Sequence, residues 1–303
     1  MATPTADRTF EASRPHSPAL HGLAERLGAV GALDGPADAL SQAIRDTLGA
    51  GALKDLLSGV PLGHPLHPVL TDAAIGTWTS ALLLDLLGGR GAQRAADALV
   101  AAGIVAAGPV IATGLSDWAD TGVQARRIGS FHALANGATL ALYVASLVAR
   151  RRGRRGLGKL LGVTAATTMT AGAHLGGHLS FALGIGVDAT TFEAPPTDWT
   201  ATGLQENDLV DGMPQVTEVA GSPVLLVRRA GRLHALADRC THRGAPLHEG
   251  RIEDGCIVCP WHGSRFGLED GAVKRGPATY PQPAFDVRVR DGAVEVRIAA
   301  GVG

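Results

Sequence analysis

Two short segments near the C-terminus constrain this chain more than any other feature, because each holds one cysteine and one histidine. Cys240 and His242 form a C-x-H pair, Cys259 and His262 form a C-x-x-H pair, and sixteen residues separate the two pairs. Two thiolates and two imidazoles predict a metal centre built from two loops that must meet in the fold. Zinc also binds two cysteines and two histidines, but its usual spacings pair Cys with Cys and His with His. The spacing therefore disfavours zinc.

The loop sequences extend this prediction. CTHRGAPL at 240–247 and CPWHGSRF at 259–266 resemble the two cluster loops of the Rieske family. The resemblance covers roughly residues 204 to 298, and we place the domain at 204–300. It implies an antiparallel β-sandwich carrying a 2Fe–2S cluster, with Cys240 and Cys259 on one iron and His242 and His262 on the other.

Four positions narrow the type of cluster that the resemblance implies. Rieske proteins of cytochrome bc complexes carry an extra cysteine in each loop, and the two form a disulfide, where this chain has Ala245 and Trp261. Ser264 is kept as a residue that tunes the potential, but Phe266 replaces a tyrosine whose hydroxyl bonds the cluster in those proteins. One hydrogen bond fewer implies a lower potential. The centre therefore resembles the ferredoxin or oxygenase type.

A Rieske oxygenase large subunit is disfavoured by the short length of chain after the cluster loops. Such a subunit needs a long mononuclear-iron domain with two histidines and a carboxylate, and only about forty residues come after His262. The third cysteine, Cys256, lies in an apolar run and is expected to be a small buried hydrophobe.

The first two thirds of the chain hold four long apolar stretches, at about 69–88, 95–115, 131–149 and 160–185. Each approaches the roughly 20 residues that a membrane-spanning helix needs. Residues 98–115 and 160–187 carry no charge, so they lack the polar face expected of a soluble Ala-rich bundle. The first stretch contains Asp72 and Asp85, which must lie inside the bundle or at its interfaces.

These patterns predict a multidomain chain, α and then β: a four-helix transmembrane bundle followed by the β-sandwich. A disordered tail is expected at 1–17, amphipathic helices at 18–60, the four-span membrane domain at 61–188 and an extended linker at 189–203. The motif GHPLHP at 63–68 also resembles a bacterial four-helix membrane family of unassigned function.

Basic residues suggest an orientation in a bacterial cell membrane. The loop between the third and fourth spans is rich in arginine, and Arg90 and Arg94 lie between the first and second. Positive-inside logic places these loops in the cytoplasm and the C-terminal domain outside. Residues 154–159, RRGLGK, also resemble a twin-arginine export signal, although an arginine cluster is also the usual mark of a cytoplasmic anchor. The basic residues of the loop are Arg150, Arg151, Arg152, Arg154, Arg155 and Lys159.

Histidines lie in or beside the spans and are expected on the same side of the membrane as the cluster. Ionisable groups at membrane depth are costly and usually functional, and imidazole ligates haem and hydrogen-bonds quinones. The sharper hypothesis is a haem b or quinone site, and the alternative is a set of interfacial side chains that cap helices. The candidates are His67, His132, His174 and His178, with His64 beside them.

The sequence therefore predicts a membrane-anchored Rieske electron-transfer protein, a component of an oxidoreductase system. Its expected partners are a redox protein or a quinone, together with the lipid bilayer. Two alternatives stay open: an electron-supply ferredoxin for a separate oxygenase or reductase, and a redox-sensing membrane protein. The net charge of −1 suggests no nucleic-acid partner, and the mean hydropathy of +0.15 agrees with membrane segments.

Overall fold

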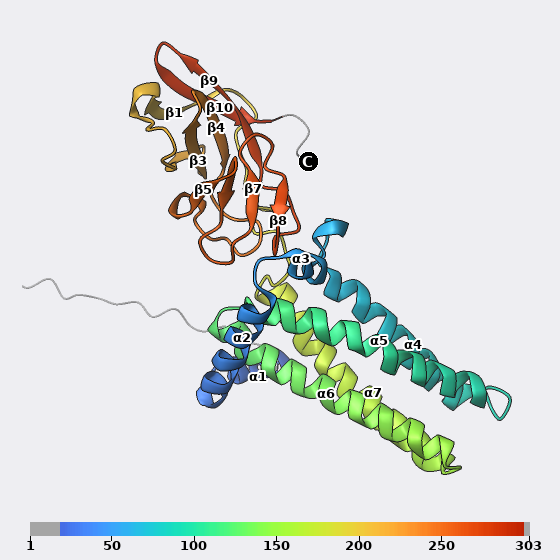
Figure 1. Cartoon of the computed structure of the whole chain (residues 1–303). Coiled ribbons are helices and arrows are strands. Elements are labelled where there is room, and N and C mark those ends of the chain that lie inside the picture. Colours follow the sequence, from blue (N-terminus) through green and yellow to red (C-terminus); the bar gives the residue numbers. More distant parts are fainter. Residues whose placement is uncertain (1–18, 300–303) are drawn as a thin grey trace, which may run out of the picture.

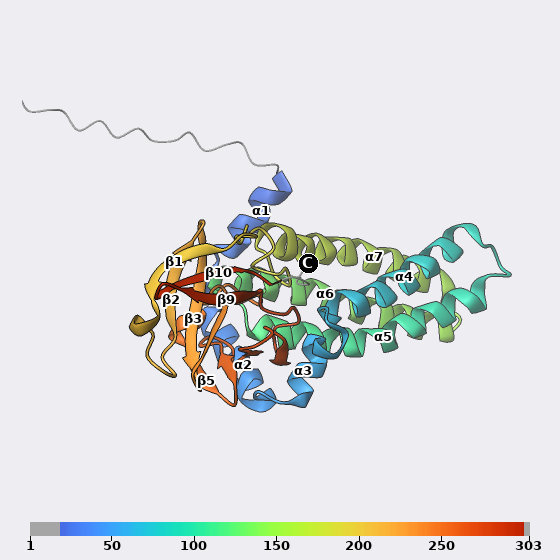
Figure 2. The ribbon, with the colours of Figure 1, turned by 90° about the horizontal axis from the view of Figure 1, so that it is seen from above.

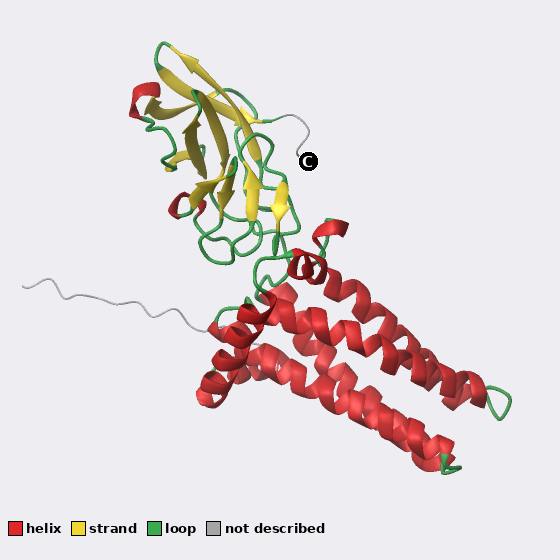
Figure 3. Ribbon diagram, viewed as in Figure 1, coloured by secondary structure: helices red, strands yellow, loops and turns green. Residues whose placement is uncertain are grey.

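The computed structural model describes residues 19–299, so the tail predicted at 1–17 lies outside it, as does residue 300 of the expected C-terminal domain. The described chain is helical first and antiparallel β afterwards (Figures 1 and 3), as predicted. The helices are α1 (Ala19–Gly28), α2 (Asp34–Leu48), α3 (Ala52–Ser58), α4 (Leu66–Leu87), α5 (Gln93–Ala119), α6 (Val123–Arg151) and α7 (Arg155–Gly177), with a π-helical turn at His178–Ala182. The strands are β1 (Thr200–Gln205), β2 (Gln215–Val219), β3 (Ser222–Arg229), β4 (Arg232–Ala237), β5 (Arg251–Glu253), β6 (Cys256–Val258), β7 (Arg265–Gly267), β8 (Val273–Arg275), β9 (Ala284–Arg290) and β10 (Ala293–Ile298).

Helices α4 to α7 run side by side as two antiparallel hairpins, α4 with α5 and α6 with α7 (Figure 1). Among the residues described, α4, α5 and α6 are long and apolar enough to cross a membrane. α7 does not meet the same criterion, because its many threonines and glycines, together with His174, lower its hydropathy. Three candidate spans are thus found where the sequence predicted four, and α7 as a fourth span stays a prediction.

Aromatic stacking across the bundle holds the middle of the hairpins. Trp78 of α4 stacks on Tyr143 of α6 with ring centroids 4.4 Å apart. The indole N–H donates to the carbonyl of Val100, 3.3 Å away. Gly103 of α5 lies so close that a Cβ there would meet Nε1 of Trp78 at 2.3 Å. Such close packing on small residues is what holds helices together in lipid, where water exclusion between helices contributes nothing.

Buried ion pairs tie the far ends of the hairpins, away from the strands. Arg150 of α6 pairs with Asp85 of α4, and with Asp97 of α5 at 3.1 Å. Arg155 of α7 reaches the same Asp97 at 3.0 Å, and Lys159 donates to the carbonyl of Asp85. Asp85 is therefore hidden inside the bundle, as its place in an apolar stretch requires. Arg150, Arg155 and Lys159, which the sequence assigned to a loop, therefore bind Asp85 and Asp97 between the helices.

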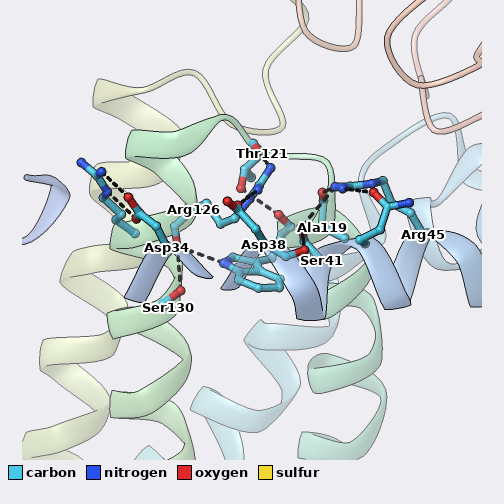
Figure 4. A network of polar contacts seen from close by, with 11 residues as sticks. Asp34, Asp38, Ser41, Arg45, Ala119, Thr121, Arg126 and Ser130 are labelled. Atoms are coloured by element: carbon cyan, nitrogen blue, oxygen red, sulfur yellow. Dashed lines mark hydrogen bonds and ion pairs between the residues drawn. The ribbon is translucent and has the colours of Figure 1, made fainter. Parts of the chain in front are cut away.

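Helices α1 to α3 pack on the other end of the hairpins, beside the strands (Figures 1 and 2). Figure 4 shows the polar contacts that fix α2 there. Asp38 of α2 pairs with Arg126 of α6, and Arg45 donates to the carbonyl of Ala119, which ends α5. The amphipathic segment expected at 18–60 thus forms a cap on the helical region, and we call this end the head.

The strands form two antiparallel sheets, which together we call the β domain. The larger has the order β1-β10-β9-β4-β3-β2 and the smaller the order β5-β6-β7-β8. Their shared core is apolar and includes Leu225 and Leu236 from the larger sheet and Ile257 and Phe266 from the smaller. Figures 1 and 2 show the β domain beside the head of the helical region.

The segment between the helices and the strands is packed along the β domain. β1 begins at Thr200, inside the stretch expected as linker, because residues 200–205 pair with β10. Before it, the amide of Ala189 donates to the carbonyl of Thr241, and Glu193 pairs with Arg239 at 3.0 Å. A segment held at several points cannot behave as a flexible tether.

Candidate functional site: two loops at the head of the helical region

Two tight loops carry the four predicted ligands, and each closes on a glycine. The amide of Gly244 donates to the carbonyl of Cys240, and the amide of Gly263 donates to the carbonyl of Cys259. The two glycines have φ angles of 72° and 74°, which side-chain-bearing residues rarely adopt. The equivalent turns place a cysteine and a histidine of each loop on the same side, facing the other loop.

The structure brings all four side chains together. The rings of His242 and His262 have centroids 5.0 Å apart and lie nearly perpendicular. The thiols of Cys240 and Cys259 are buried and lie within hydrogen-bonding reach of one another. Their contact raises the pKa of the Cys240 thiol, which burial raises further, and lowers the pKa of Cys259 to about 7. The pair therefore gives up one proton readily and holds the second, unless a cation takes its place.

The histidines show the same need for a ligand. Nδ1 of His242 and Nδ1 of His262 are buried without a hydrogen-bond partner among the described residues. Unsatisfied buried nitrogens cost free energy, and a group bound between the loops would relieve that cost. Within residues 19–299 no three or more His, Cys, Asp or Glu side chains gather around a single-ion position. Two thiols and two open imidazole nitrogens fit a two-iron cluster, because each iron then takes two protein ligands.

Buried side chains next to the loops fix their shape. Oε1 of Gln282 accepts from the amide of Thr241, while its Nε2 donates to the carbonyls of Ala237 and Arg239. In the second loop the hydroxyl oxygen of Ser264 accepts from the amide of Ala278 at 3.0 Å. Ser264 is fully buried, and its proton has no acceptor among the described residues. That proton is free to point toward a group held between the loops.

Helix α3 joins the loops' end of the β domain to the helical head. Nζ of Lys54 lies 2.7 Å from Oδ2 of Asp120 and donates to Ser116 of α5. The next residue, Asp55, accepts from the amide of Gly276 at 2.8 Å and pairs with Arg275 at 3.3 Å. Adjacent residues of a helix point in different directions, so α3 binds the helices with one side chain and the β domain with the next.

This docking turns the histidine edge of the site toward the helices. A cavity of ≈ 460 Å³ lies between the β domain and the head, and His262, Trp261 and Arg243 line one side. Asp120 and apolar side chains from the helical side, including Leu183, line the other. Its lining mixes apolar side chains with charged and aromatic ones.

The structure separates the histidines that the sequence grouped. His67 of α4 and His132 of α6 are half-buried between the helices, where Nδ1 of each hydrogen-bonds a backbone carbonyl. His174 is exposed on α7, and His178 packs its ring against His21 of α1, with centroids 5.1 Å apart. Two of the four predicted histidines, His67 and His132, therefore lie between the helices of the bundle.

Comparison with known proteins supports the family resemblance of the two loops. The Rieske 2Fe-2S domain family matches residues 199–286. The ferredoxin subunit of an anthranilate 1,2-dioxygenase from Burkholderia cepacia is 33% identical over 106 residues, which are 35% of this chain and 97% of that protein. This chain belongs to the Rieske family.

Two further Rieske proteins are similar to the same part of the chain. The iron–sulfur subunit of a cytochrome b6-f complex from Chlorobaculum tepidum is 31% identical over 93 residues, 31% of this chain and 50% of the subunit. Among solved structures, the ferredoxin of a carbazole 1,9a-dioxygenase from Nocardioides aromaticivorans matches 33% of this chain and 98% of its own, with 28% identity and a TM-score of 0.32.

The helical region matches a second family. Residues 63–189 match a predicted membrane protein family, DUF2231, so the fusion expected from the GHPLHP motif is confirmed. A Rieske domain implies a 2Fe–2S cluster, and the helical family agrees with membrane association.

Four residues at the site could not be identified from the sequence. Lys54, Asp55, Gln282 and Arg243 act through contacts between segments far apart in the chain, and no motif marks them. Ordinary charged residues on short helices are most often solvated, so their types carried no signal.

Proposed function

We propose that this chain is a membrane-anchored one-electron carrier whose Rieske cluster faces the membrane surface. Cys240 and Cys259 hold one iron, and Nδ1 of His242 and of His262 hold the other. The observation that carries the proposal is the pairing of two touching thiols with two unpartnered imidazole nitrogens. When bound, the cluster supplies a site that accepts and releases single electrons.

Ser264 tunes the cluster. Its hydroxyl oxygen already accepts from Ala278, so its proton is left to bond a thiolate or sulfide of the cluster. Such a bond stabilises the reduced, more negative state and raises the potential. Phe266 is buried in β7 and supplies no second hydroxyl.

The docked position of the β domain suggests where the electrons come from. In a soluble ferredoxin the histidine edge must stay open to a partner protein, whereas here it lines a cavity shared with the helical head. Apolar side chains, together with the charged side chains of Asp120 and Arg243, suit an amphipathic, lipid-soluble donor such as a hydroquinone. We propose this cavity as the place where a quinol meets His262.

Nanodiscs carrying the full chain test this proposal. Stopped-flow absorbance follows reduction of the oxidised cluster by a lipid-soluble hydroquinone, and in parallel by a reduced soluble ferredoxin reductase. Reduction by the hydroquinone that slows at least tenfold in Leu183→Trp, which fills the cavity, supports the proposal. Reduction by the reductase alone contradicts it. Val289→Trp, on an exposed strand away from the cavity, is the matched control.

The membrane arrangement is also a proposal. We place α4 to α7 across the bilayer, with the loops at the far ends of the hairpins in the cytoplasm and the Rieske domain outside. Arg90, Arg94, Arg151, Arg152 and Arg154 support this orientation, since they remain near those loops. A C-terminal reporter active only outside the cytoplasm tests it, and a reporter active only in the cytoplasm would overturn it.

A second function has support from the relatives. The Burkholderia protein is named a dioxygenase ferredoxin subunit, and the chain covers nearly its whole length. The Rieske domain would then leave its dock to supply electrons to a separate oxygenase. Copurification of an oxygenase, together with reduction by the soluble reductase in the nanodisc assay, would favour this role.

A further inference from the structure

The two helical hairpins correspond to each other residue by residue. His67, Trp78 and Asp85 of α4 have the same spacing as His132, Tyr143 and Arg150 of α6, and 65 positions separate the members of each pair. The second helices correspond as well, with Gly114 and Val110 of α5 lying 62 positions before Gly176 and Gly172 of α7. The near-constant offsets indicate a helical region built from two copies of one hairpin.

The corresponding residues meet across the bundle. Trp78 stacks on Tyr143, and Asp85 pairs with Arg150. Equivalent residues that touch each other lie on a two-fold axis, which here runs along the helices between α4 and α6. His67 and His132 are the third pair of equivalent residues, one on α4 and one on α6, at the end nearest the Rieske domain.

Each of these histidines is held in the same way. Nδ1 of His67 lies 3.1 Å from the carbonyl of Val110, and Nδ1 of His132 lies 2.8 Å from the carbonyl of Gly172. A ring nitrogen beside a carbonyl must carry the proton, so Nε2 keeps its lone pair. Metal-binding histidines are fixed in this manner, with one ring nitrogen on a backbone carbonyl and the other on the metal.

Glycines make room for both rings. A Cβ at Gly114 would meet Cε1 of His67 at 2.8 Å, and one at Gly176 would meet Cε1 of His132 at 3.0 Å. Nε2 of His132 is reached by the amide of Asn136 at 3.0 Å, and Nε2 of His67 has no hydrogen bond from a described residue. Both imidazoles are thus held as neutral acceptors at equivalent positions around the axis.

We propose that His67 and His132 are the axial ligands of one haem, bound on the two-fold axis between the hairpins. The ligand count identifies the class of ligand. Zinc needs three or four protein ligands, and no third His, Cys, Asp or Glu joins this pair among the described residues. A porphyrin supplies four nitrogens itself and leaves two axial positions for imidazoles.

The packing of the bundle is compatible with a flat ligand. Helix contacts are dense within each hairpin and sparse between the hairpins. A macrocycle bound there would lie along the seam between the hairpins, above the stacked rings of Trp78 and Tyr143. Its position on the axis, at the end nearest the Rieske domain, would place a second one-electron centre on the cluster's side of the bundle.

Spectroscopy of the purified full chain, expressed with a haem precursor, tests the proposal. We expect a Soret band, about one haem per chain by pyridine haemochrome, and a low-spin ferric EPR signal. His67→Ala and His132→Ala should each abolish the low-spin signal, and the double variant should retain no haem. His174→Ala is the matched control, because this exposed histidine lies on the same half of the bundle but off the axis.

The cluster's own EPR signal reports folding in every variant, and it separates this inference from the proposed function. Protein that binds haem but carries no cluster would contradict the cluster assignment and leave the haem site standing. Full-length protein that carries the cluster but binds no haem overturns the axial site, as does stoichiometric quinone in its place. A Soret band lost in His174→Ala but kept in the axial double variant would overturn it equally.

Discussion

The chain contains two histidine pairs with opposite patterns of hydrogen bonding. In the Rieske loops, Nδ1 of His242 and of His262 are buried without a partner among the described residues. In the bundle, Nδ1 of His67 and of His132 each lie against a backbone carbonyl. Under the two proposals the unpartnered Nδ1 would bind the metal in the loops, and Nε2 would do so in the bundle, where Asn136 would have to release Nε2 of His132.

The two pairs also differ in how far they depend on an occupant. The loops combine unpartnered nitrogens with two touching thiols, so under the proposed assignment a bound cluster would stabilise them. The bundle satisfies its histidines internally and is also held by Trp78 with Tyr143 and by Arg150 with Asp85. Losing a loop ligand should therefore disturb its domain far more than losing a bundle histidine.

The largest expected effect comes from the loops. Cys259→Ala removes one of two thiolates, so we expect complete loss of the cluster, measured as iron and sulfide content and as the EPR signal. The Rieske domain should then unfold at a markedly lower temperature. Cys256→Ala is the matched control, since Cys256 is buried on β6 outside the ligand set and should leave the cluster intact. Equal loss in both variants would contradict the ligand assignment.

The next effect concerns the buried pair beneath the loops. Lys54→Ala leaves Asp120 unpaired in a buried position, which should lower the free energy of unfolding by about 3–5 kcal/mol. Denaturant titration in detergent measures the change. Lys274→Ala breaks an exposed Lys–Asp pair and should cost about 0–1 kcal/mol. Similar costs for the two lysines would show that the Lys54 pair is solvated and does not hold the head together.

A smaller effect should come from the contact that docks the Rieske domain. Asp55→Ala removes the bonds to Gly276 and Arg275, at a cost of about 1–3 kcal/mol in docking free energy. Hydrogen exchange should rise at Gly276 and in the segment before β1, while the cluster remains. Asp72→Ala, on an exposed face of α4, should change neither. Unchanged exchange in Asp55→Ala would argue that other contacts hold the domains.

The smallest effect is on the potential. Ser264→Ala removes one hydrogen bond to the reduced cluster, worth about 1 kcal/mol. For one electron this lowers the potential by about 40 mV, since a tenfold change in equilibrium corresponds to about 59 mV. Potentiometric EPR measures the shift. A potential that does not move would place the Ser264 proton away from the cluster.

The sequence predicted local chemistry better than long-range contacts. The ligand loops could be predicted from the sequence because a C-x-H pair and a C-x-x-H pair lie within about twenty residues of each other. Each pair is followed by a glycine turn. The apolar stretches likewise predicted α4 to α6, whose hydropathy is a property of single segments. The bridging role of Lys54 and Asp55 could not be foreseen, because it arises only when α3 lies between two domains.

The histidines show the same limit. Their expected position on one side of the membrane, and the cost of ionisable groups at that depth, favoured a shared site for His67, His132, His174 and His178. In the structure His174 is exposed and His178 packs on His21, a contact with a helix far away in sequence. We infer the link between His67 and His132 from spacings that recur at an offset of 65 positions in two hairpins that share few identical residues.

EPR of dithionite-reduced membranes containing the full chain tests the central claim most directly. Two thiolates on one iron and two imidazoles on the other predict the low average g value of a Rieske centre, with nitrogen hyperfine coupling from His242 and His262. A higher average g value without nitrogen coupling, as in an all-cysteine cluster, would contradict the assignment. A silent spectrum from protein that holds one zinc per chain would contradict it as well.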